Sequence, residues 1–288
     1  MALCLGLALP VPCGAWGPEG HRIVAQIAWS YLTPASRAEA TALLNGQTLP
    51  DVSDWADTVR RDPAYAWTAP LHYANVCPGC SEFDYQRDCP DAGCVVWAIR
   101  QFAEDLRNPT GDRARRRDAL RFLVHFVADV HQPLHVAHAA DRGGNDIRVE
   151  FFGSPMDLHE VWDSAILQYA GRPWREYAAD LRARIGPLES STWSSSTDPS
   201  EWATESFRLA EAVAYPIPPD RWLGFPYYHR ALPVVEERLM AAGVRLGRLL
   251  NDTFSPYTGP STWPTTTRAA SRNSSHGDPV SGFGRPAP

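Results

Sequence analysis

Residues 118–135 read Asp-Ala-Leu-Arg-Phe-Leu-Val-His-Phe-Val-Ala-Asp-Val-His-Gln-Pro-Leu-His, and this stretch decides the fold class. Its apolar residues belong to a helical pattern that runs from about residue 113 to residue 130, and Pro133 breaks or kinks that pattern. His125 and Asp129 are four residues apart, so on a helix they lie one above the other on a single face. The stretch therefore predicts a long helix that carries an imidazole and a carboxylate among apolar neighbours.

The same spacing recurs in Leu158-His159-Glu160-Val161-Trp162-Asp163, where His159 and Asp163 are also four residues apart. One such pair alone is more often a surface ion pair or a helix cap. Both pairs have apolar neighbours, however, and charge in such surroundings is costly unless it is paired or bound to a metal. His135 follows the break at Pro133, which can redirect its side chain toward the same region. Imidazole and carboxylate ligands suit zinc with open positions for water, so the sequence predicts a metal site.

Helical signals extend along most of the chain. Further helices are expected after Trp16, from Thr33-Pro34 with Thr33 as N-cap, and over about 52–60, 95–106, 157–169, 174–185, 199–214 and 228–250. Residues 147–152 alternate and are β-branched or aromatic, which permits a short strand or hairpin arm. We therefore expect an all-α fold with one mostly helical domain over residues 16–253. Residues 254–288 are rich in Pro, Ser, Thr and Gly and predict a disordered tail.

The N-terminal segment has the features of a signal peptide over residues 1–15. Residues 1–12 form a short apolar run, and the small residues Cys13-Gly14-Ala15 precede Trp16, although the usual basic segment is missing. The run is too short to span a bilayer, and a buried N-terminal helix is the alternative. We expect a protein that is secreted or periplasmic and does not associate with a membrane.

Four cysteines lie within residues 77–94 in a segment rich in Pro, Gly and Asp: Cys77, Cys80, Cys89 and Cys94. Their spacing could suggest a zinc ribbon. In an exported protein two local disulfides that staple a loop are favoured, and the spacing alone leaves three pairings open.

The charge composition limits the chemistry. The chain has 288 residues, a net charge of −6, and 27 basic residues that are all Arg. The absence of Lys excludes a lysine nucleophile, a Schiff base and a phosphate-binding loop of the Gly-Lys-Ser/Thr type. The run from Arg113 to Arg117 is interpreted as a solvated helix face. Positive charge for a polyanionic substrate must therefore come from elsewhere, such as bound metal.

Several motifs together carry a family resemblance. They are Trp16-Gly17-Pro18-Glu19-Gly20-His21, Trp55-Ala56-Asp57-Thr58-Val59-Arg60, Leu71-His72-Tyr73, the stretch from His125 to His135, Gly143-Gly144-Asn145, and residues 158–163. In order and spacing they resemble the single-strand-specific zinc-dependent nucleases, which include mung bean nuclease, the fungal single-strand nucleases and the plant bifunctional nucleases. The resemblance covers nearly all of residues 16–251 and implies a mostly helical domain around three zinc ions.

The resemblance also implies which residues hold the zinc ions. Nine residues would do so: Trp16 (through its free α-amino group and carbonyl) and His21 for the first ion, Asp57, His72 and His125 for the second, Asp129 as a bridge between these two, and His135, His159 and Asp163 for the third. It further implies a disulfide between Cys89 and Cys94, which leaves Cys77 and Cys80 as the other pair.

The implied activity is hydrolysis of single-stranded DNA and RNA at the P–O3′ bond to 5′-phosphate products, with 3′-nucleotidase activity, in a monomer. Asp57 and Asp129 would be catalytic through the zinc ions, and Arg60 would bind the phosphate and stabilise the transition state. Tyr73 would stack on a base, with core packing as its alternative role. Asn75 stands where fungal members carry an Asp that contacts the base edge, so base preference stays open. Asn145 would bond a phosphate or a metal ligand.

Two other functions fit parts of the pattern. A zinc-dependent phospholipase C shares the trinuclear zinc site and the N-terminal Trp, and a secreted zinc-binding protein without activity would need no substrate site. The neighbourhood of Tyr73 and Asn75 and the Gly-Gly-Asn turn favour the nuclease. The complete set of ligand residues argues against an inactive protein.

Overall fold

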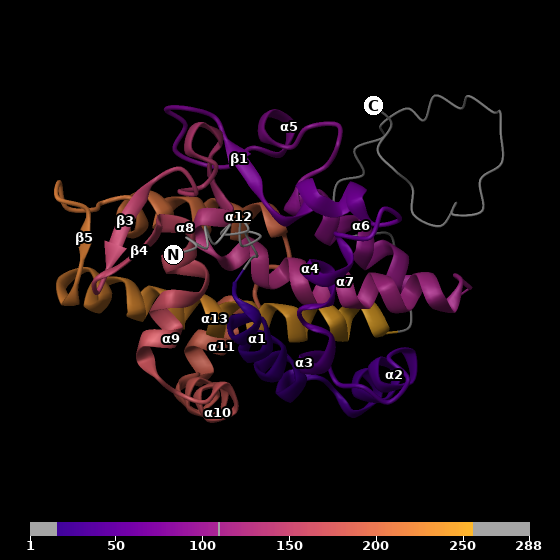
Figure 1. The fold of residues 1–288 in the computed structure, drawn as a ribbon. Coiled ribbons are helices and arrows are strands. Elements are labelled where there is room, and N and C mark those ends of the chain that lie inside the picture. The colour runs from indigo at the N-terminus through magenta and orange to yellow at the C-terminus, as the bar shows by residue number, and fades with distance from the viewer. Residues whose placement is uncertain (1–15, 109, 256–288) are drawn as a thin grey trace, which may run out of the picture.

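The computed structural model describes residues 16–108 and 110–255, which form a helical body with two small sheets (Figure 1). The all-α prediction is confirmed. The expected signal peptide, residues 1–15, lies outside the described residues, as does the expected tail apart from Phe254 and Ser255. Within the described part of the chain, no helix is both long and apolar enough to cross a membrane.

The helices of the first half of the chain follow one another closely. They are α1 (Pro18–Tyr31), α2 (Pro34–Leu43), α3 (Leu49–Val52), α4 (Trp55–Val59), the 3₁₀ helix η1 (Ala66–His72), α5 (Tyr85–Asp88), α6 (Val95–Arg107), α7 (Arg113–His131), and the 3₁₀ helices η2 (Pro133–His135) and η3 (Ala139–Asp141). Thr33 caps α2 as expected, since its hydroxyl accepts a hydrogen bond of 3.1 Å from the backbone N–H of Ser36.

The second half adds the longest helix of the described residues, α13 (Phe225–Phe254), and two π turns. Its helical elements are α8 (Leu158–Glu160), the π turn η4 (Val161–Ala165), α9 (Ile166–Ala170), α10 (Trp174–Arg184), α11 (Pro187–Trp193), α12 (Pro199–Leu209), the π turn η5 (Ala210–Ala214) and α13. The expected helix over 157–169 is thus a helix interrupted by a π turn, and α11 and α5 were not expected from the sequence.

Helix α7 lies at the centre of the molecule. From Asp118 to His131 every residue except Arg121 is buried. It packs against α6, α1 and α13, and α13 also runs against α1 (Figure 1). Phe102 of α6 stacks on Phe122 of α7 at a ring-centroid distance of 4.5 Å. A helix that is buried on nearly all sides can hold its polar residues only where partners surround them.

The helix expected over about 52–60 is present as α4 but begins later, because α3 ends at Val52 and Ser53 and Asp54 separate the two helices. The carbonyl of the buried Ser53 accepts a 2.8 Å hydrogen bond from Nδ1 of His125. Asp54 forms an ion pair with Arg22 at 3.0 Å. These tertiary contacts with α7 and α1 outweigh the local preference for a continuous helix.

Two small sheets join segments that lie apart in the sequence. Strand β1 (Ala74–Val76) pairs in parallel with β2 (Val136–His138), in the register Ala74 with Val136, and this pairing was not predicted. The strand signal at 147–152 is confirmed, since β3 (Arg148–Phe151) pairs antiparallel with β4 (Ser154–Asp157). Strand β5 (Trp222–Leu223) pairs in parallel with β3.

The cysteine-rich segment is a loop around the short helix α5, with two disulfides. Cys77 pairs with Cys80 and Cys89 pairs with Cys94. These are local staples of the kind expected for an exported protein, and the zinc ribbon alternative is wrong.

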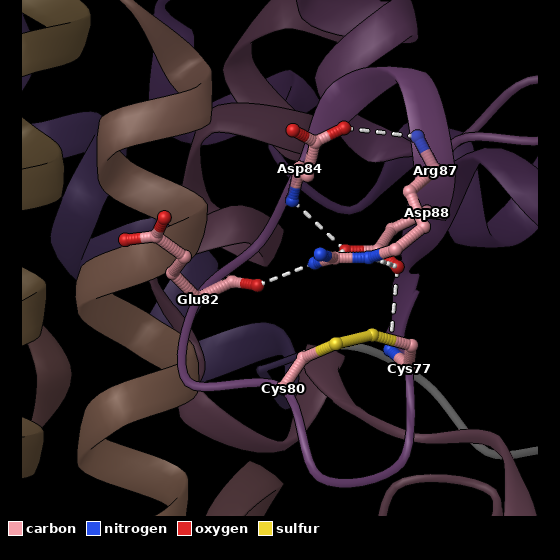
Figure 2. Close-up of a disulfide and its surroundings, with 6 residues drawn as sticks. All are labelled: Cys77, Cys80, Glu82, Asp84, Arg87 and Asp88. Atoms are coloured by element: carbon pink, nitrogen blue, oxygen red, sulfur yellow. Dashed lines mark hydrogen bonds and ion pairs between the residues drawn. A yellow bond between two sulfur atoms is a disulfide. The ribbon is translucent and has the colours of Figure 1, made fainter.

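The buried carboxylate of Asp88 accepts hydrogen bonds from several parts of the same loop (Figure 2). It accepts hydrogen bonds from the backbone N–H of Cys77 at 3.2 Å and of Asp84 at 2.8 Å, and from Nε of Arg87 at 2.9 Å. Burial opposes its ionisation, but the hydrogen bonds from Arg87 and Asp84 outweigh that effect, so the pKa of Asp88 lies below its usual value. The loop is therefore fixed next to the end of β1.

A buried ionic network joins α7, α12 and α13. Glu205 binds Arg238 at 2.8 Å and Arg245 at 2.6 Å, and both guanidinium groups are buried. Arg245 also lies 3.0 Å from Nε2 of His131 at the end of α7. Burial opposes the ionisation of Glu205, but the hydrogen bond from Arg245 and the charge of Arg238 outweigh it and lower its pKa.

We expect Glu205→Gln to lower the free energy of unfolding by about 2–3 kcal/mol at pH 7, because two buried guanidinium groups lose their counter-ion. This expected loss of stability is smaller than that for a fully buried ion pair, because the Glu205 side chain is 40% exposed and solvent screens its charge. Since its folded-state pKa is depressed, its stabilisation is present above the unfolded-state pKa of about 4.3 and is lost as the pH falls below it. The difference between wild type and variant, measured by urea unfolding, should shrink from about pH 4 downward.

The matched control is Glu82→Gln, which breaks an ion pair with Arg208 in which both side chains are 61% exposed. It should change the stability by less than about 1 kcal/mol. Equal losses in the two variants would contradict the role assigned to the buried network.

Candidate metal centre

The carboxylate of Asp129 on α7 is completely buried and is surrounded by three histidines. Nε2 of His21, from α1, lies 3.1 Å from Oδ1. Nδ1 of His72, from η1, lies 3.0 Å from Oδ2, and Nε2 of His125 lies 3.4 Å from the same oxygen. Segments that are far apart in the sequence therefore converge on one carboxylate.

Asp57 on α4 completes a second group with two of these histidines. Its Oδ1 lies 3.8 Å from Nδ1 of His72 and 3.7 Å from Nε2 of His125. Among the described residues this buried oxygen accepts no hydrogen bond. Nη1 of Arg60 lies 3.4 Å from it. A buried oxygen that faces two imidazole nitrogens and accepts no hydrogen bond within the described part of the chain is suited to a cation.

The third group lies at the start of the helix that contains the π turn. Nε2 of His135 and Nε2 of His159 are 3.2 Å apart. Oδ1 of Asp163 lies 3.7 Å from Nε2 of His135, and its Oδ2 lies 3.3 Å from Nε2 of His159. Side-chain nitrogens and oxygens in each of three sets lie within 4.8 Å of one another: His21, His125 and Asp129; Asp57, His72 and His125; His135, His159 and Asp163.

Backbone carbonyls orient three of the imidazoles. The Nδ1–H groups of His125, His135 and His159 donate to carbonyl oxygens at 2.8, 2.7 and 2.7 Å. The acceptors belong to Ser53, His72 and Gly143 respectively. This arrangement places the proton on Nδ1 and leaves the Nε2 lone pair directed at the carboxylates, which is the tautomer that binds a metal through Nε2.

The short parallel pairing of β1 with β2 connects the second and third groups. His72 ends η1 two residues before β1, and His135 directly precedes β2. The ladder begins at Ala74 with Val136, and the carbonyl of His72 accepts the hydrogen bond from His135. The strands therefore hold the two histidines at a fixed separation.

The N-terminal end of the described chain lies against the same centre. The side chain of Trp16 is fully buried, and its carbonyl contacts Nδ1 of His21. The backbone N–H of Gly17 donates to the carbonyl of Asp163 at 2.7 Å. A Cβ on Gly17 would lie 2.3 Å from Oγ of Ser164 and 3.3 Å from the carbonyl oxygen of Asp163, so a larger residue would require Ser164 to move.

The pKa directions of His125, Asp129 and Asp57 agree with the protonation states of metal ligands, whereas the pKa values of His21 and His135 are raised. Burial lowers the pKa of His125 to about 3, which keeps its imidazole neutral. Burial opposes the ionisation of Asp129, but the surrounding histidines outweigh it and hold its pKa well below the usual value. The pKa of Asp57 is lowered in the same way, with His125 and His72 as the largest favourable contributions. Neutral imidazole and ionised carboxylate are the forms that bind metal.

A cleft of about 320 Å³ opens above these groups. It is lined by all four residues that were expected to bind substrate, Arg60, Tyr73, Asn75 and Asn145, together with His72, His135 and His159. Tyr73 is 43% exposed, which excludes core packing as its role. The amide Nδ2 of Asn145 donates to the carbonyl of Arg142 at 2.6 Å, so it bonds the backbone of its own turn.

Two residues of the site were not expected from the sequence. Gln132, fully buried, donates from Nε2 to Oδ1 of Asp163 at 2.6 Å and accepts from the backbone N–H of Leu134. Arg142 lines the cleft in the turn that precedes Gly143. Neither residue belongs to a spacing pattern in the sequence. The contact with Asp163 identifies Gln132, and the position in the cleft lining identifies Arg142.

Comparison with known proteins agrees with this geometry. The family model of the S1/P1 Nuclease matches residues 16–255. The chain is 34% identical to Endonuclease 4 of Arabidopsis thaliana over 83% of this chain and 89% of the plant protein. It is 32% identical to Nuclease S1 of Aspergillus oryzae, over 85% and 94% of the two chains, and 28% identical to Nuclease P1 of Penicillium citrinum, over 82% and 97%.

The chain therefore belongs to the S1/P1 nuclease family, which confirms the resemblance inferred from the motifs. It is a nuclease, a hydrolase that acts on phosphodiester bonds, and nucleases of this family are zinc-dependent. Among the described residues, the three groups of His and Asp side chains could hold such ions.

Gly143→Ala tests the link between the cleft turn and the third group. Gly143 has φ 63°, and an added Cβ would lie 2.3 Å from the carbonyl oxygen of Leu134, so the turn must move. Because the Gly143 carbonyl orients His159, we expect metal affinity to fall by about 10–100-fold, measured by metal content after dialysis against competing chelator.

Gly153→Ala is the matched control. Gly153 also has a positive φ, 85°, but an added Cβ there meets no atom within 4 Å. It should cost about 1–2 kcal/mol of stability from backbone strain and leave the metal content unchanged. Loss of metal in both variants would refute a specific role for the Gly143 carbonyl.

Proposed function

We propose that the chain is a zinc-dependent endonuclease that hydrolyses single-stranded DNA and RNA at the P–O3′ bond, leaving 5′-phosphates, and that also acts as a 3′-nucleotidase. The observation that carries the proposal is the convergence of three ligand groups beneath a cleft lined by Arg60 and Tyr73. The acidic chain, at net charge −6, needs a local source of positive charge to bind a polyanion, and a metal cluster answers that need.

The donor set fits three zinc ions. Imidazole nitrogen and carboxylate oxygen are zinc ligands, and the buried Oδ1 of Asp57, which accepts no hydrogen bond among the described residues, indicates a position for a cation. Asp57, His72 and His125 would hold one ion, His135, His159 and Asp163 another, and His21 with the Trp16 backbone a third, with Asp129 shared between the first and last of these. Bound zinc would supply an activated water and neutralise phosphate charge.

The chain's own residues position the substrate. Arg60 is held beside Asp57 and faces the cleft, where its guanidinium can bind a phosphate oxygen and stabilise charge in the transition state. Tyr73 offers an exposed ring for a base, and Asn75, next in the same lining, can bond the base edge. A base can stack there only when it has left a duplex, which accounts for single-strand preference.

We propose that the enzyme is exported to the periplasm or medium and acts as a monomer. Two local disulfides support an oxidising compartment. In this proposal residues 1–15 are a signal peptide, residues 16–253 are the nuclease domain, and cleavage before Trp16 frees the α-amino group that joins the site.

The first test is metal content together with substrate range. We expect about three zinc ions per chain, rapid cleavage of single-stranded oligonucleotides, release of phosphate from 3′-AMP, and loss of both activities with chelator. Asp129→Asn should lower both activities at least about 100-fold and reduce the zinc content. Turnover of phosphatidylcholine without cleavage of oligonucleotides would instead support a phospholipase, and a zinc-loaded protein inert on all three substrates would support a binding protein.

Tyr73→Ala tests the stacking role. Removal of the ring should raise KM for single-stranded oligonucleotides about 5–50-fold, the range for one lost base contact. Tyr73→Phe should retain most of the affinity, because it keeps the ring. If Tyr73→Phe lost as much as Tyr73→Ala, the hydroxyl would be the group that matters and stacking would be refuted.

A further inference from the structure

Arg142 is a charged residue of the cleft lining that has no role in the function proposed above. It follows the 3₁₀ helix η3 as its cap, in the left-handed conformation with φ 54°. It lines the cleft together with Arg60, His135 and His159. An arginine in the wall of a site that acts on phosphodiesters is a candidate for phosphate binding.

The backbone that carries Arg142 is held firmly. The next carbonyl, of Gly143, accepts the hydrogen bond from Nδ1 of His159. The carboxylate of Asp141 accepts hydrogen bonds from the backbone N–H of Gly144 at 2.9 Å and from the hydroxyl of Tyr215 at 3.0 Å. The arginine is thus attached, one residue away, to the third ligand group, and its Cα is fixed relative to that group.

The guanidinium group itself is only weakly engaged. The ion pair of Arg142 is with Asp146, at 3.8 Å, and the two side chains are 67% and 53% exposed. A pair that long and that exposed contributes little stability. The arginine can therefore leave Asp146 for a stronger, charge-assisted contact at small cost.

The distribution of charge in the cleft indicates what that contact is. The lining contains two guanidinium groups, Arg60 and Arg142, and no carboxylate. Arg60 contacts Asp57 of the second group, whereas Arg142 is attached to the third group. The two guanidinium groups are therefore attached to different ligand groups, so a strand with successive phosphates offers each of them a partner.

We propose that Arg142 binds a phosphate adjacent to the one being cleaved, and so makes the enzyme prefer a strand over a 3′-mononucleotide. This rests on the proposed function, in which both substrates are hydrolysed in the same cleft. A 3′-mononucleotide carries one phosphate and leaves Arg142 unused. A strand carries a second phosphate, and the additional contact raises kcat/KM for the strand alone.

The test compares Arg142→Gln with wild-type zinc-loaded enzyme on a single-stranded oligonucleotide and on 3′-AMP. The ratio of the two kcat/KM values, strand over mononucleotide, should fall about ten-fold. Binding of a fluorescent single-stranded phosphorothioate, followed by anisotropy over a salt series, should weaken, and its slope of log Kd against log salt should decrease by about 0.7, as for one lost phosphate contact.

Two controls separate phosphate binding from other effects. Arg148→Gln removes another exposed arginine whose ion pair, with Asp157, is also 3.8 Å long but which does not line the cleft, and it should leave the ratio unchanged. Asp146→Asn breaks the same ion pair while keeping the arginine, and should leave strand binding equal or tighter.

The outcomes that overturn the inference are distinct from failure of the proposed function. If Arg142→Gln lowers both activities equally, the residue supports the site and does not select strands. If it changes neither activity, or if Asp146→Asn reproduces the loss, no phosphate contact exists. If the wild-type enzyme cleaves neither substrate, the proposed function fails first and this inference with it.

Discussion

The carboxylate of Asp129 is buried completely within the central helix, and burial of an unpaired charge would cost more than a domain's whole margin of stability. Its compensation comes from His21, His72 and His125 at 3.0–3.4 Å. These histidines belong to α1, η1 and α7, so the requirement to pair one charge fixes how three segments meet. Metal bound at this point would stabilise the folded state, because the unfolded chain has no such cluster.

The rest of the centre depends on backbone groups that the fold leaves available. The carbonyl of Ser53 is available because α3 ends there, and the carbonyl of Gly143 is available because it lies in a left-handed turn. Each accepts a hydrogen bond from a histidine Nδ1 and so directs that residue's Nε2 at the carboxylates. The irregular points in the backbone are thus the points that orient the ligands. Alanine at position 143 is unsuitable for steric reasons as well as for its positive φ.

The sequence predicted those parts of the fold and site that depend on local spacing. The i,i+4 pairs His125 with Asp129 and His159 with Asp163 follow from helical geometry. By contrast, nothing local connects His72 with His135, because β1 and β2 are three residues long and too short to show a period. The break at Ser53 and the role of Gln132 were also not predicted, because both depend on tertiary contacts that local spacing does not show. The motif resemblance found His21, Asp57 and His72, whereas the residues alone did not.

An acidic chain can bind a phosphodiester only where the local charge at its site differs from its net charge. With a net charge of −6, the protein as a whole repels a nucleic acid strand, and long-range attraction is screened beyond about 8–10 Å at physiological salt. The lining of the cleft has two arginines and no carboxylate, while Asp57 and Asp129 lie beneath it and face histidines. With metal bound, the charge of these carboxylates would be directed at the cations and would no longer oppose a phosphate above them. The proposed ligand set would then act twice, by holding the metal and by removing its own negative charge from the substrate's path.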